Sequence, residues 1–252
     1  MTDTPPPDRA GGPGAIETGA LAFETLAVHA GQDPDELTGA VSVPIYQTST
    51  FAQDGVGRPR RGYEYGRSQN PTRERLEQAV ARLEGGRFGI AFASGSAATA
   101  TIAELLAPGE QAIVGDDVYG GTWRFFERVG RPRGLDAQFV DLSGEGAPAL
   151  GGALGEATRM VWFETPTNPH LRLVDIAAVA DRVRRHRGAR SERPIVVVDN
   201  TFASPALQRP LELGADVVVH SATKYLAGHS DVINGVAITN DEAIAERLRF
   251  LQ

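Results

Sequence analysis

The stretch IVVVDNTFASPALQRPLELGADVVVHSATK, residues 195–224, contains two short apolar runs, each followed by polar side chains. Similar apolar runs recur along the chain at residues 88–93, 112–115, 137–140, 160–163 and 235–238. Segments with the length and spacing of helices, such as IAAVADRVRRH at 176–186, separate most of these runs. Continuous apolar strands that alternate with helices predict an α/β fold in which helices flank a mostly parallel, mixed sheet.

Two segments precede this pattern. Residues 1–20 hold four prolines and four glycines without the apolar run of a secretory signal, so we expect a disordered tail. Residues 21–62 predict an irregular amino-terminal arm with a short helix near 21–31. Residues 63–252 form the predicted α/β domain. Its first helix is expected to begin at Asn70-Pro71, which suit the N-cap and first helical positions, and to end at Gly85-Gly86.

Composition limits the classes of function. The 25 basic and 32 acidic side chains give a net charge of 25 − 32 = −7, which argues against nucleic acid as a partner. The sequence has no cysteine, which excludes disulfides, thiolate metal sites and a cysteine nucleophile. No apolar run is long enough to cross a bilayer, so we expect a cytoplasmic protein without a membrane partner.

The residues that follow each apolar run form the candidate site, because α/β proteins bind ligands at the carboxyl ends of their parallel strands. Gly95 lies between two serines after the run at 88–93, where a helix is expected to begin. Free N–H groups at a helix start attract anions, and phosphate is the anion that we expect here. The alternative is a tight strand-to-helix turn that binds nothing.

Asp199 follows the first run of the opening stretch, and Lys224 follows the second within the segment HSATK. A carboxylate at the end of a buried strand needs a cationic or hydrogen-bonding partner, although it also suits a helix N-cap. A desolvated lysine at such a place suits Schiff-base chemistry, whereas an isolated one is an ordinary surface residue. Together with the turn at Gly95, these residues are the parts needed to hold pyridoxal phosphate.

A metal site and a serine nucleophile are the other chemistries to consider. His220, His229 and Asp231 lie close together in the sequence but show no metal-binding spacing, so we expect structural or hydrogen-bonding roles for them and no metal. A GxSxG serine elbow is also absent from the sequence.

Several segments in order carry a family resemblance. They read TGAVSVPIYQTSTF (38–51), YEYGRSQNPTR (63–73), AFASGSAAT (91–99), DDVYGGT (116–122), ETPTNP (164–169), VVDNTFASPALQRPLELGAD (197–216) and HSATKYLAGHSDV (220–232). From about residue 23 to its end, the chain resembles the cysteine/methionine-metabolism family of pyridoxal-phosphate enzymes, and most resembles its cystathionine γ-lyase and γ-synthase branch. The resemblance implies the large domain of a fold-type I pyridoxal-phosphate transferase.

The resemblance also implies roles for the cofactor-binding residues. Lys224 forms the covalent imine with the cofactor, and Asp199 pairs with the nitrogen of its pyridine ring. Gly95 and Ser96 bind the phosphate through backbone N–H groups. The hydroxyls of Ser221 and Thr223 assist them in holding the phosphate.

Four further residues have roles that come from the resemblance alone. Tyr119 stacks on the cofactor ring and assists proton transfer, and Asn168 lies near the ring hydroxyl. Tyr65 and Arg67 reach the phosphate of a neighbouring subunit. The resemblance therefore implies active sites shared across a dimer, and a homotetramer as the complete assembly.

The activity implied is trans-sulfuration at Cγ of sulfur amino acids. Elimination from cystathionine gives cysteine, 2-oxobutanoate and ammonia, whereas replacement by cysteine on an O-acylhomoserine gives cystathionine. An O-acylhomoserine sulfhydrylase is the nearest alternative, and a β-lyase is a more distant one. Family members continue for a carboxyl-terminal domain after the segment matching RLRFLQ (247–252), so we expect that domain to be missing. A catalytically inactive, truncated cofactor-binding chain is therefore a further alternative.

Overall fold

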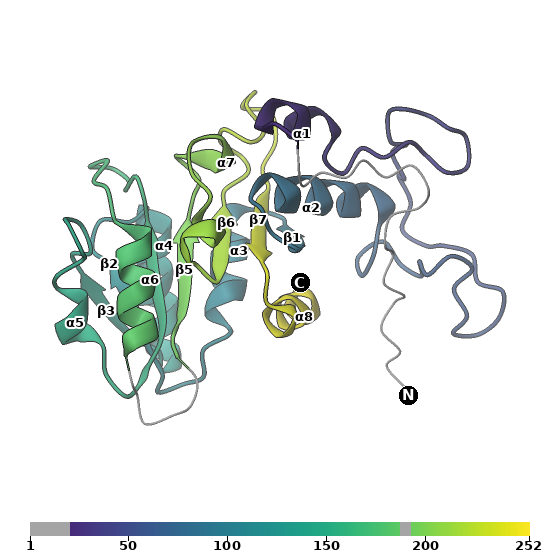
Figure 1. Ribbon diagram of the computed structural model, residues 1–252. Helices are drawn as coiled ribbons and strands as arrows, with labels where there is room; N and C mark the ends of the chain where they lie inside the picture. Colours follow the sequence, from purple (N-terminus) through teal and green to yellow (C-terminus); the bar gives the residue numbers. More distant parts are fainter. Residues whose placement is uncertain (1–20, 187–192) are drawn as a thin grey trace. The chain divides into compact units, whose positions relative to one another are not determined.

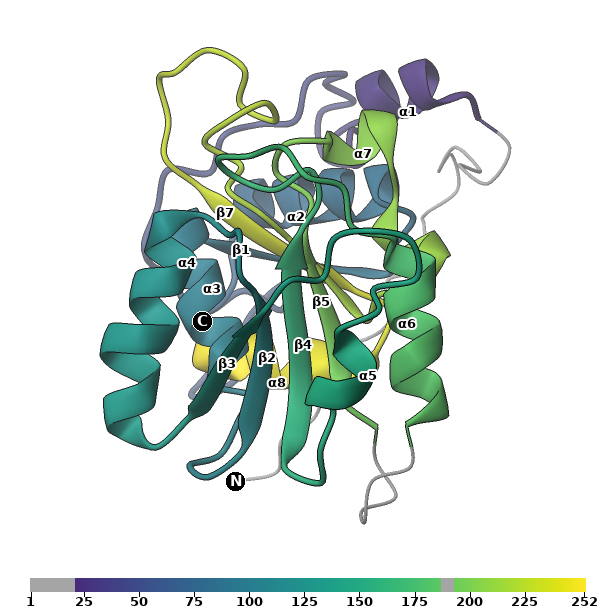
Figure 2. The same cartoon turned by 90° about the vertical axis from the view of Figure 1, so that its left-hand side faces the viewer.

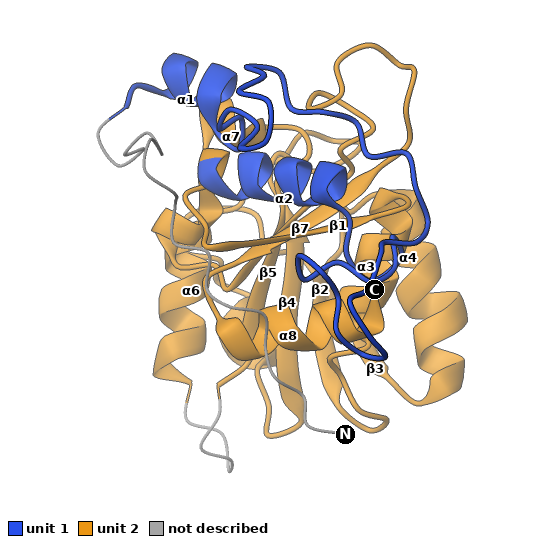
Figure 3. Ribbon diagram, turned by 90° about the vertical axis from the view of Figure 1, so that its right-hand side faces the viewer, with its two compact units in different colours: residues 1–82 blue, residues 83–252 orange. Residues whose placement is uncertain are grey.

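The computed structural model describes residues 21–186 and 193–252. The predicted disordered tail, residues 1–20, lies outside the described residues. The chain divides into two compact units, residues 1–82 and residues 83–252, which Figure 3 colours separately. The predicted division into an arm that ends at residue 62 and a domain that begins at residue 63 stays a prediction.

Unit 1 contains two helices in its described part, α1 (Phe23–His29) and most of α2 (Pro71–Leu83). The predicted start of α2 is confirmed, because Asn70 Oδ1 accepts the N–H of Thr72 at 2.9 Å. The guanidinium of Arg73 donates to the carbonyl oxygens of Arg67 and Ser68, at 2.8 and 2.6 Å. These bonds hold the loop before α2 against the first turn of that helix.

Unit 2 is built on one seven-stranded sheet within the described residues, with the order β1-β7-β6-β5-β4-β2-β3 (Figure 1). The strands are β1 (Phe88–Phe92), β2 (Gln111–Gly115), β3 (Asp136–Val140), β4 (Thr158–Glu164), β5 (Ile195–Asp199), β6 (Val217–His220) and β7 (Gly235–Thr239). Strand β7 runs antiparallel to β1 and β6, and the other pairs are parallel. The predicted mostly parallel, mixed sheet is confirmed.

Helices cover both faces of the sheet, as Figure 2 shows. Helices α3 (Gly95–Ala103), α4 (Gly120–Phe125) and α8 (Glu242–Leu251) lie on one face, and α5 (Leu150–Ala153) and α6 (Ile176–Arg185) lie on the other. A π-helical turn, η2 (Phe126–Gly130), and a 3-10 turn, η3 (Arg131–Arg133), follow α4. Two short elements, α7 (Ser204–Leu207) and η4 (Pro210–Leu213), connect β5 to β6.

The apolar strands are buried on both faces, and alternate side chains enter two separate cores. Met160 and Trp162 of β4 pack with the α3 and α8 side of the sheet, whereas Val161 and Phe163 pack with α6. The ring of Phe126 meets that of Trp162 edge-on, with centroids 5.8 Å apart. Two-sided burial explains why these strands read as continuous apolar runs rather than as alternating patterns.

The register of the central strands brings their carboxyl ends to one level. Glu164, the last residue of β4, pairs with Asp199, the last residue of β5. Asp199 in turn pairs with Val219 of β6, one residue before that strand ends at His220. Loops that carry polar residues leave from this edge. Within residues 21–186 and 193–252, no helix is both long and apolar enough to cross a membrane.

Candidate active site

A cavity of about 290 Å³ lies at this edge of the sheet in unit 2. Eight of the ten residues predicted for the site line it, namely Gly95, Ser96, Tyr119, Asn168, Asp199, Ser221, Thr223 and Lys224. They lie at the end of β5 or in the segments that directly follow β1, β2, β4 and β6. The parallel topology therefore gathers segments that are far apart in the sequence, as expected for the carboxyl edge of an α/β sheet.

The turn from β1 into α3 forms one wall of the cavity. Ser94 is the N-cap of α3, and its Oγ accepts the N–H of Ala97 at 3.0 Å. The N–H groups of Gly95 and Ser96 lie in the first helical turn, where no acceptor exists within the helix. A Cβ atom on Gly95 would lie 2.7 Å from Cβ of Ser221, so only glycine fits this close approach between α3 and the loop after β6.

Two acidic side chains meet at the floor of the cavity. Asp199 is half-buried and accepts the N–H of Thr201 through Oδ1 at 2.9 Å, and burial raises its pKa. Glu164 is only 5% exposed, and both burial and the neighbouring Asp199 raise its pKa well above the ordinary value. Two adjacent carboxyls that are shielded from water resist being charged together. A cationic group bound beside Asp199 would offset this cost.

Sequence reasoning missed Glu164. Its carboxylate accepts the N–H of Tyr119 at 2.7 Å and also a backbone N–H bond from Asn168. Glu164 therefore ties together the loops that present these two predicted residues to the cavity. Its signals in the sequence were its place directly after the apolar run at 160–163 and its position at the start of the family segment ETPTNP (164–169).

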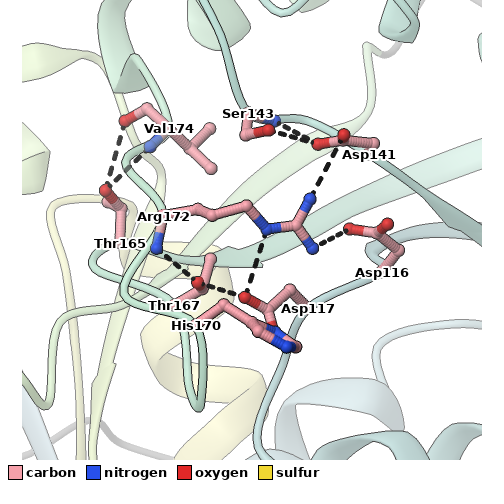
Figure 4. A network of polar contacts seen from close by, with 9 residues as sticks. All are labelled: Asp116, Asp117, Asp141, Ser143, Thr165, Thr167, His170, Arg172 and Val174. Atoms are coloured by element: carbon pink, nitrogen blue, oxygen red, sulfur yellow. Dashed lines mark hydrogen bonds and ion pairs between the residues drawn. The ribbon is translucent and has the colours of Figure 1, made fainter.

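The same two loops are joined further from the cavity by a network around Asp117 (Figure 4). The carboxylate of Asp117 accepts a hydrogen bond from the hydroxyl of Thr167, and its oxygens lie 2.8 Å from Nδ1 of His170 and 3.3 Å from Nε of Arg172. Arg172 also pairs with Asp116 at 3.1 Å. Burial alone would raise the pKa of Asp117, but these hydrogen bonds outweigh it and lower the pKa to about 2.

Lys224 lies in the cavity lining, with an exposed side chain. The burial expected for a reactive lysine is therefore not found in this chain. Lys224 is the only lysine in the sequence, since all other basic residues counted with it are arginines. Thr223 also lines the cavity, but its hydroxyl already bonds to the backbone of Asn234 at 3.1 Å, so its predicted contact with phosphate stays a prediction.

Tyr65 and Arg67 belong to unit 1, and the cavity lining is made by unit 2 residues. Both side chains are exposed, and the Arg67 guanidinium carbon lies 5.1 Å from the centre of the Tyr65 ring. Their predicted role at the phosphate of a neighbouring subunit stays a prediction.

Across the described ranges, no group of three or more His, Cys, Asp or Glu side chains is placed to hold a metal ion.

Comparison with known proteins identifies the class. Residues 24–252 match the family of Cys/Met metabolism PLP-dependent enzymes, and the chain belongs to this family. The predicted family is therefore confirmed, as are its fold-type I architecture and its use of pyridoxal phosphate as the cofactor.

Particular relatives carry three different names. A cystathionine β-lyase of Coxiella burnetii is 54% identical over 91% of this chain and 58% of its own length. A probable cystathionine γ-synthase of Herpetosiphon aurantiacus is 51% identical over 91% of this chain and 69% of its own length. The crystal structure of cystathionine γ-lyase from yeast is 48% identical, with a TM-score of 0.85 over 92% of this chain and 57% of that one. The chain thus spans little more than half the length of most of these relatives.

The cavity fits the chemical groups of pyridoxal phosphate. The first turn of α3 offers backbone N–H donors to a phosphate, and the close approach at Gly95 leaves no room for a side chain there. The Asp199–Glu164 pair favours a cationic partner such as a protonated ring nitrogen. Lys224 lines the same cavity, and its amine could form an imine with an aldehyde group.

Gly95→Ala should weaken binding of pyridoxal phosphate at least about tenfold, because the added methyl forces α3 and Ser221 apart where the phosphate donors lie. Gly152→Ala is the matched control, since a Cβ there meets no atom within 4 Å. Titration of each variant with the cofactor, followed by absorbance, measures the effect. Equal affinity in Gly95→Ala and the parent would contradict the close approach described above.

Asp117→Asn should remove a pH-dependent part of the stability. The folded state lowers the pKa of Asp117 from 3.8 to about 2, so its contribution is fully present above about pH 4 and is lost as the pH falls towards 2. The expected loss in the free energy of unfolding at pH 6 is about 2 kcal/mol. Urea unfolding at pH 2.5 to 6 should show parent and variant converging at the acidic end. Asp136→Asn, at an exposed residue, serves as the control. If the difference in the free energy of unfolding between the parent and Asp117→Asn did not change with pH, the assignment would be refuted.

Proposed function

We propose that the chain binds pyridoxal phosphate in the cavity and attaches it covalently through Nζ of Lys224. The observation that carries the proposal is the convergence of Lys224, Asp199 and the first turn of α3 on one cavity. A lysine near a strand end is by itself an ordinary surface residue. Lys224 differs from such a residue because a helix start suited to an anion and a paired carboxylate line the same cavity.

Each further residue of the cavity has a part in holding the cofactor. Asp199 would hold the ring nitrogen in its protonated form, and Asn168 would help to hold the ring hydroxyl. The backbone N–H groups of Gly95 and Ser96 hold the phosphate, with the hydroxyl of Ser221 beside them. Tyr119, which is 51% exposed at the start of α4, provides a ring on which the cofactor stacks.

The reaction proposed is cleavage or formation of a C–S bond at Cγ of cystathionine, as in the γ-lyases and γ-synthases of the family. Bound pyridoxal phosphate supplies an electron sink for a carbanion at Cα of the amino acid. The amine of Lys224 would take the proton from Cα and then a proton from Cβ, because the Cβ–H bond must break before the substituent on Cγ is lost. It is the one lysine available as a general base and acid, and it would return protons as the Cγ–S bond breaks. The hydroxyl of Tyr119 assists the transfer at the leaving sulfur. Water then completes the release of 2-oxobutanoate and ammonia together with cysteine.

β-Elimination is a second candidate, since the relative that is 54% identical is named a cystathionine β-lyase. That reaction breaks the other C–S bond of cystathionine and gives pyruvate, ammonia and homocysteine. Sulfhydrylation of an O-acylhomoserine and an inactive cofactor-binding chain remain as further alternatives. They differ in products, so one set of assays separates them.

The proposed assembly is a homo-oligomer, a homotetramer with active sites shared across a dimer. The exposed side chains of Tyr65 and Arg67 support it, because they are free to reach a phosphate in a second copy. Pairing of a guanidinium with a phosphate is a strong charge-assisted interaction.

Borohydride reduction in the presence of pyridoxal phosphate should add one pyridoxyl group, on the peptide that contains Lys224. Lys224→Arg keeps the positive charge but has no primary amine, and it leaves the chain without any lysine. That variant should show no adduct beyond labelling of the amino terminus, which peptide mass spectrometry locates separately. Labelling of the parent at its amino terminus alone would contradict the attachment.

Cystathionine should give 2-oxobutanoate rather than pyruvate when it is incubated with the cofactor-loaded chain, because Cγ is the proposed point of cleavage. Two assays distinguish the oxoacids. A limiting amount of lactate dehydrogenase reduces pyruvate faster than 2-oxobutanoate, and chromatography separates the hydrazones of the two compounds. Lys224→Arg should abolish either product. Pyruvate as the product would favour the β-lyase reaction, and homocysteine formed from O-succinylhomoserine and sulfide would favour the sulfhydrylase. A loaded chain that forms no product from cystathionine, or from O-succinylhomoserine with either cysteine or sulfide, would favour the inactive alternative.

A further inference from the structure

A second polar layer is buried in unit 2, and none of the proposed catalytic steps uses it. It consists of Glu84, Thr165, Asn200, Gln208 and His220, and we refer to it as the subfloor network. Glu84 Oε1 lies 2.5 Å from Nε2 of His220 and accepts Nδ2 of Asn200 at 2.8 Å. Gln208 Nε2 donates to Oδ1 of Asn200 at 2.9 Å and to the carbonyl of Thr165 at 2.6 Å. The five residues are thus joined without a break.

The subfloor network lies one residue away from the cavity at three strand ends. His220 precedes Ser221, Asn200 lies between Asp199 and Thr201, and Thr165 follows Glu164. Their neighbours Ser221, Asp199, Thr201 and Glu164 line the cavity. Side chains of neighbouring residues in extended backbone point to opposite sides. At these strand ends, the side chains of the network therefore lie on one face of the sheet and the cavity residues point to the other. The network restrains the backbone that carries the cavity residues.

Burial makes the network costly as a source of stability. Glu84, His220 and Asn200 are fully buried. A buried ion pair gains little net free energy over apolar residues of the same size, because both groups lose their hydration. Oε2 of Glu84 and Nδ1 of His220 also have no hydrogen-bond partner among the described residues, which adds to the cost. A requirement for geometry explains such a cluster better than a requirement for stability.

The network also acts on Asp199 through charge. Burial raises the pKa of Asp199, whereas a positive charge on His220 acts in the opposite direction and favours the carboxylate. The same His220 is held by Glu84, which is the second residue of unit 2 and directly follows α2. Position and charge at the floor of the cavity thus depend on one buried pair.

We propose that the subfloor network positions the cofactor site. Its members Glu84, His220, Asn200 and Gln208 are positioning residues, which set the backbone at the ends of β5 and β6 so that Asp199 and Ser221 face the cavity. The inference rests on the proposed function for its ligand, pyridoxal phosphate. It goes beyond that function because none of these four residues lines the cavity.

The test compares Glu84→Met with Thr158→Val. Methionine has a similar length and removes the acceptor of both Asn200 and His220. Thr158 is equally buried, but its hydroxyl bonds to Gln111 at the amino end of β4, the opposite end of the sheet. Both changes remove the polar contacts of a fully buried side chain. Their different distances from the cavity separate positioning from general stability.

Glu84→Met should weaken cofactor binding about tenfold and speed backbone hydrogen exchange at residues 199–201 and 219–222, because buried donors lose their acceptor at these strand ends. Thr158→Val should lower the unfolding midpoint to a similar extent but leave cofactor affinity within about twofold of the parent. Glu84→Gln keeps an acceptor oxygen and should recover most of the affinity.

Gln208→Leu keeps the proposal testable if Glu84→Met does not fold. Its side chain is only half-buried, and it removes the two bonds to Asn200 and Thr165. It should also speed exchange at residues 199–201. Parent-like affinity and exchange in this variant, or an equal loss of affinity in Thr158→Val, would overturn the proposal. Exchange rates need no cofactor, so a parent chain that failed to bind pyridoxal phosphate would contradict the proposed function and still leave the positioning role decided.

Discussion

The parallel pairing of β4, β5 and β6 is the constraint on which the site depends. Glu164 lies opposite Asp199, and Asp199 lies opposite Val219, so the three strands end at nearly the same level. A slip of one residue would turn the side chain of Asp199 to the other face of the sheet. The apolar side chains that enter the two cores on either side make such a slip expensive, and the position of the carboxylate follows from them.

Polar contacts then decide how the loops leave this edge. The Asp117 network joins the segment after β2 to the segment after β4, on one side of the cavity. The subfloor network joins the ends of β4, β5 and β6 from beneath. Both contain side chains that make two or more hydrogen bonds, such as Asp117 and Asn200, and hydrogen bonds restrict direction more than apolar contacts do. The apolar cores thus build the sheet, and the polar clusters give the cavity its shape.

The electrostatics of the cavity show a division of charge. Glu164 and Asp199 are adjacent carboxyls whose pKa values are raised by burial, while the helix start at Gly95 provides a partial positive charge nearby. Such an arrangement costs folding free energy and is typical of functional sites. A ligand with one cationic ring nitrogen and one phosphate would complement both halves. This match connects the fold to the family to which the chain belongs.

The sequence by itself determined the strands, their burial, the helix start at Asn70 and the likeness to pyridoxal-phosphate enzymes. These follow from local patterns, because two-sided burial selects continuous apolar runs and a helix start selects a capping residue. Only the tertiary structure decided that Glu164 holds Tyr119 and Asn168, and that Glu84 meets His220 across 136 positions of sequence. Contacts of this kind depend on strand order and register, and no single segment records which distant segment will lie beside it.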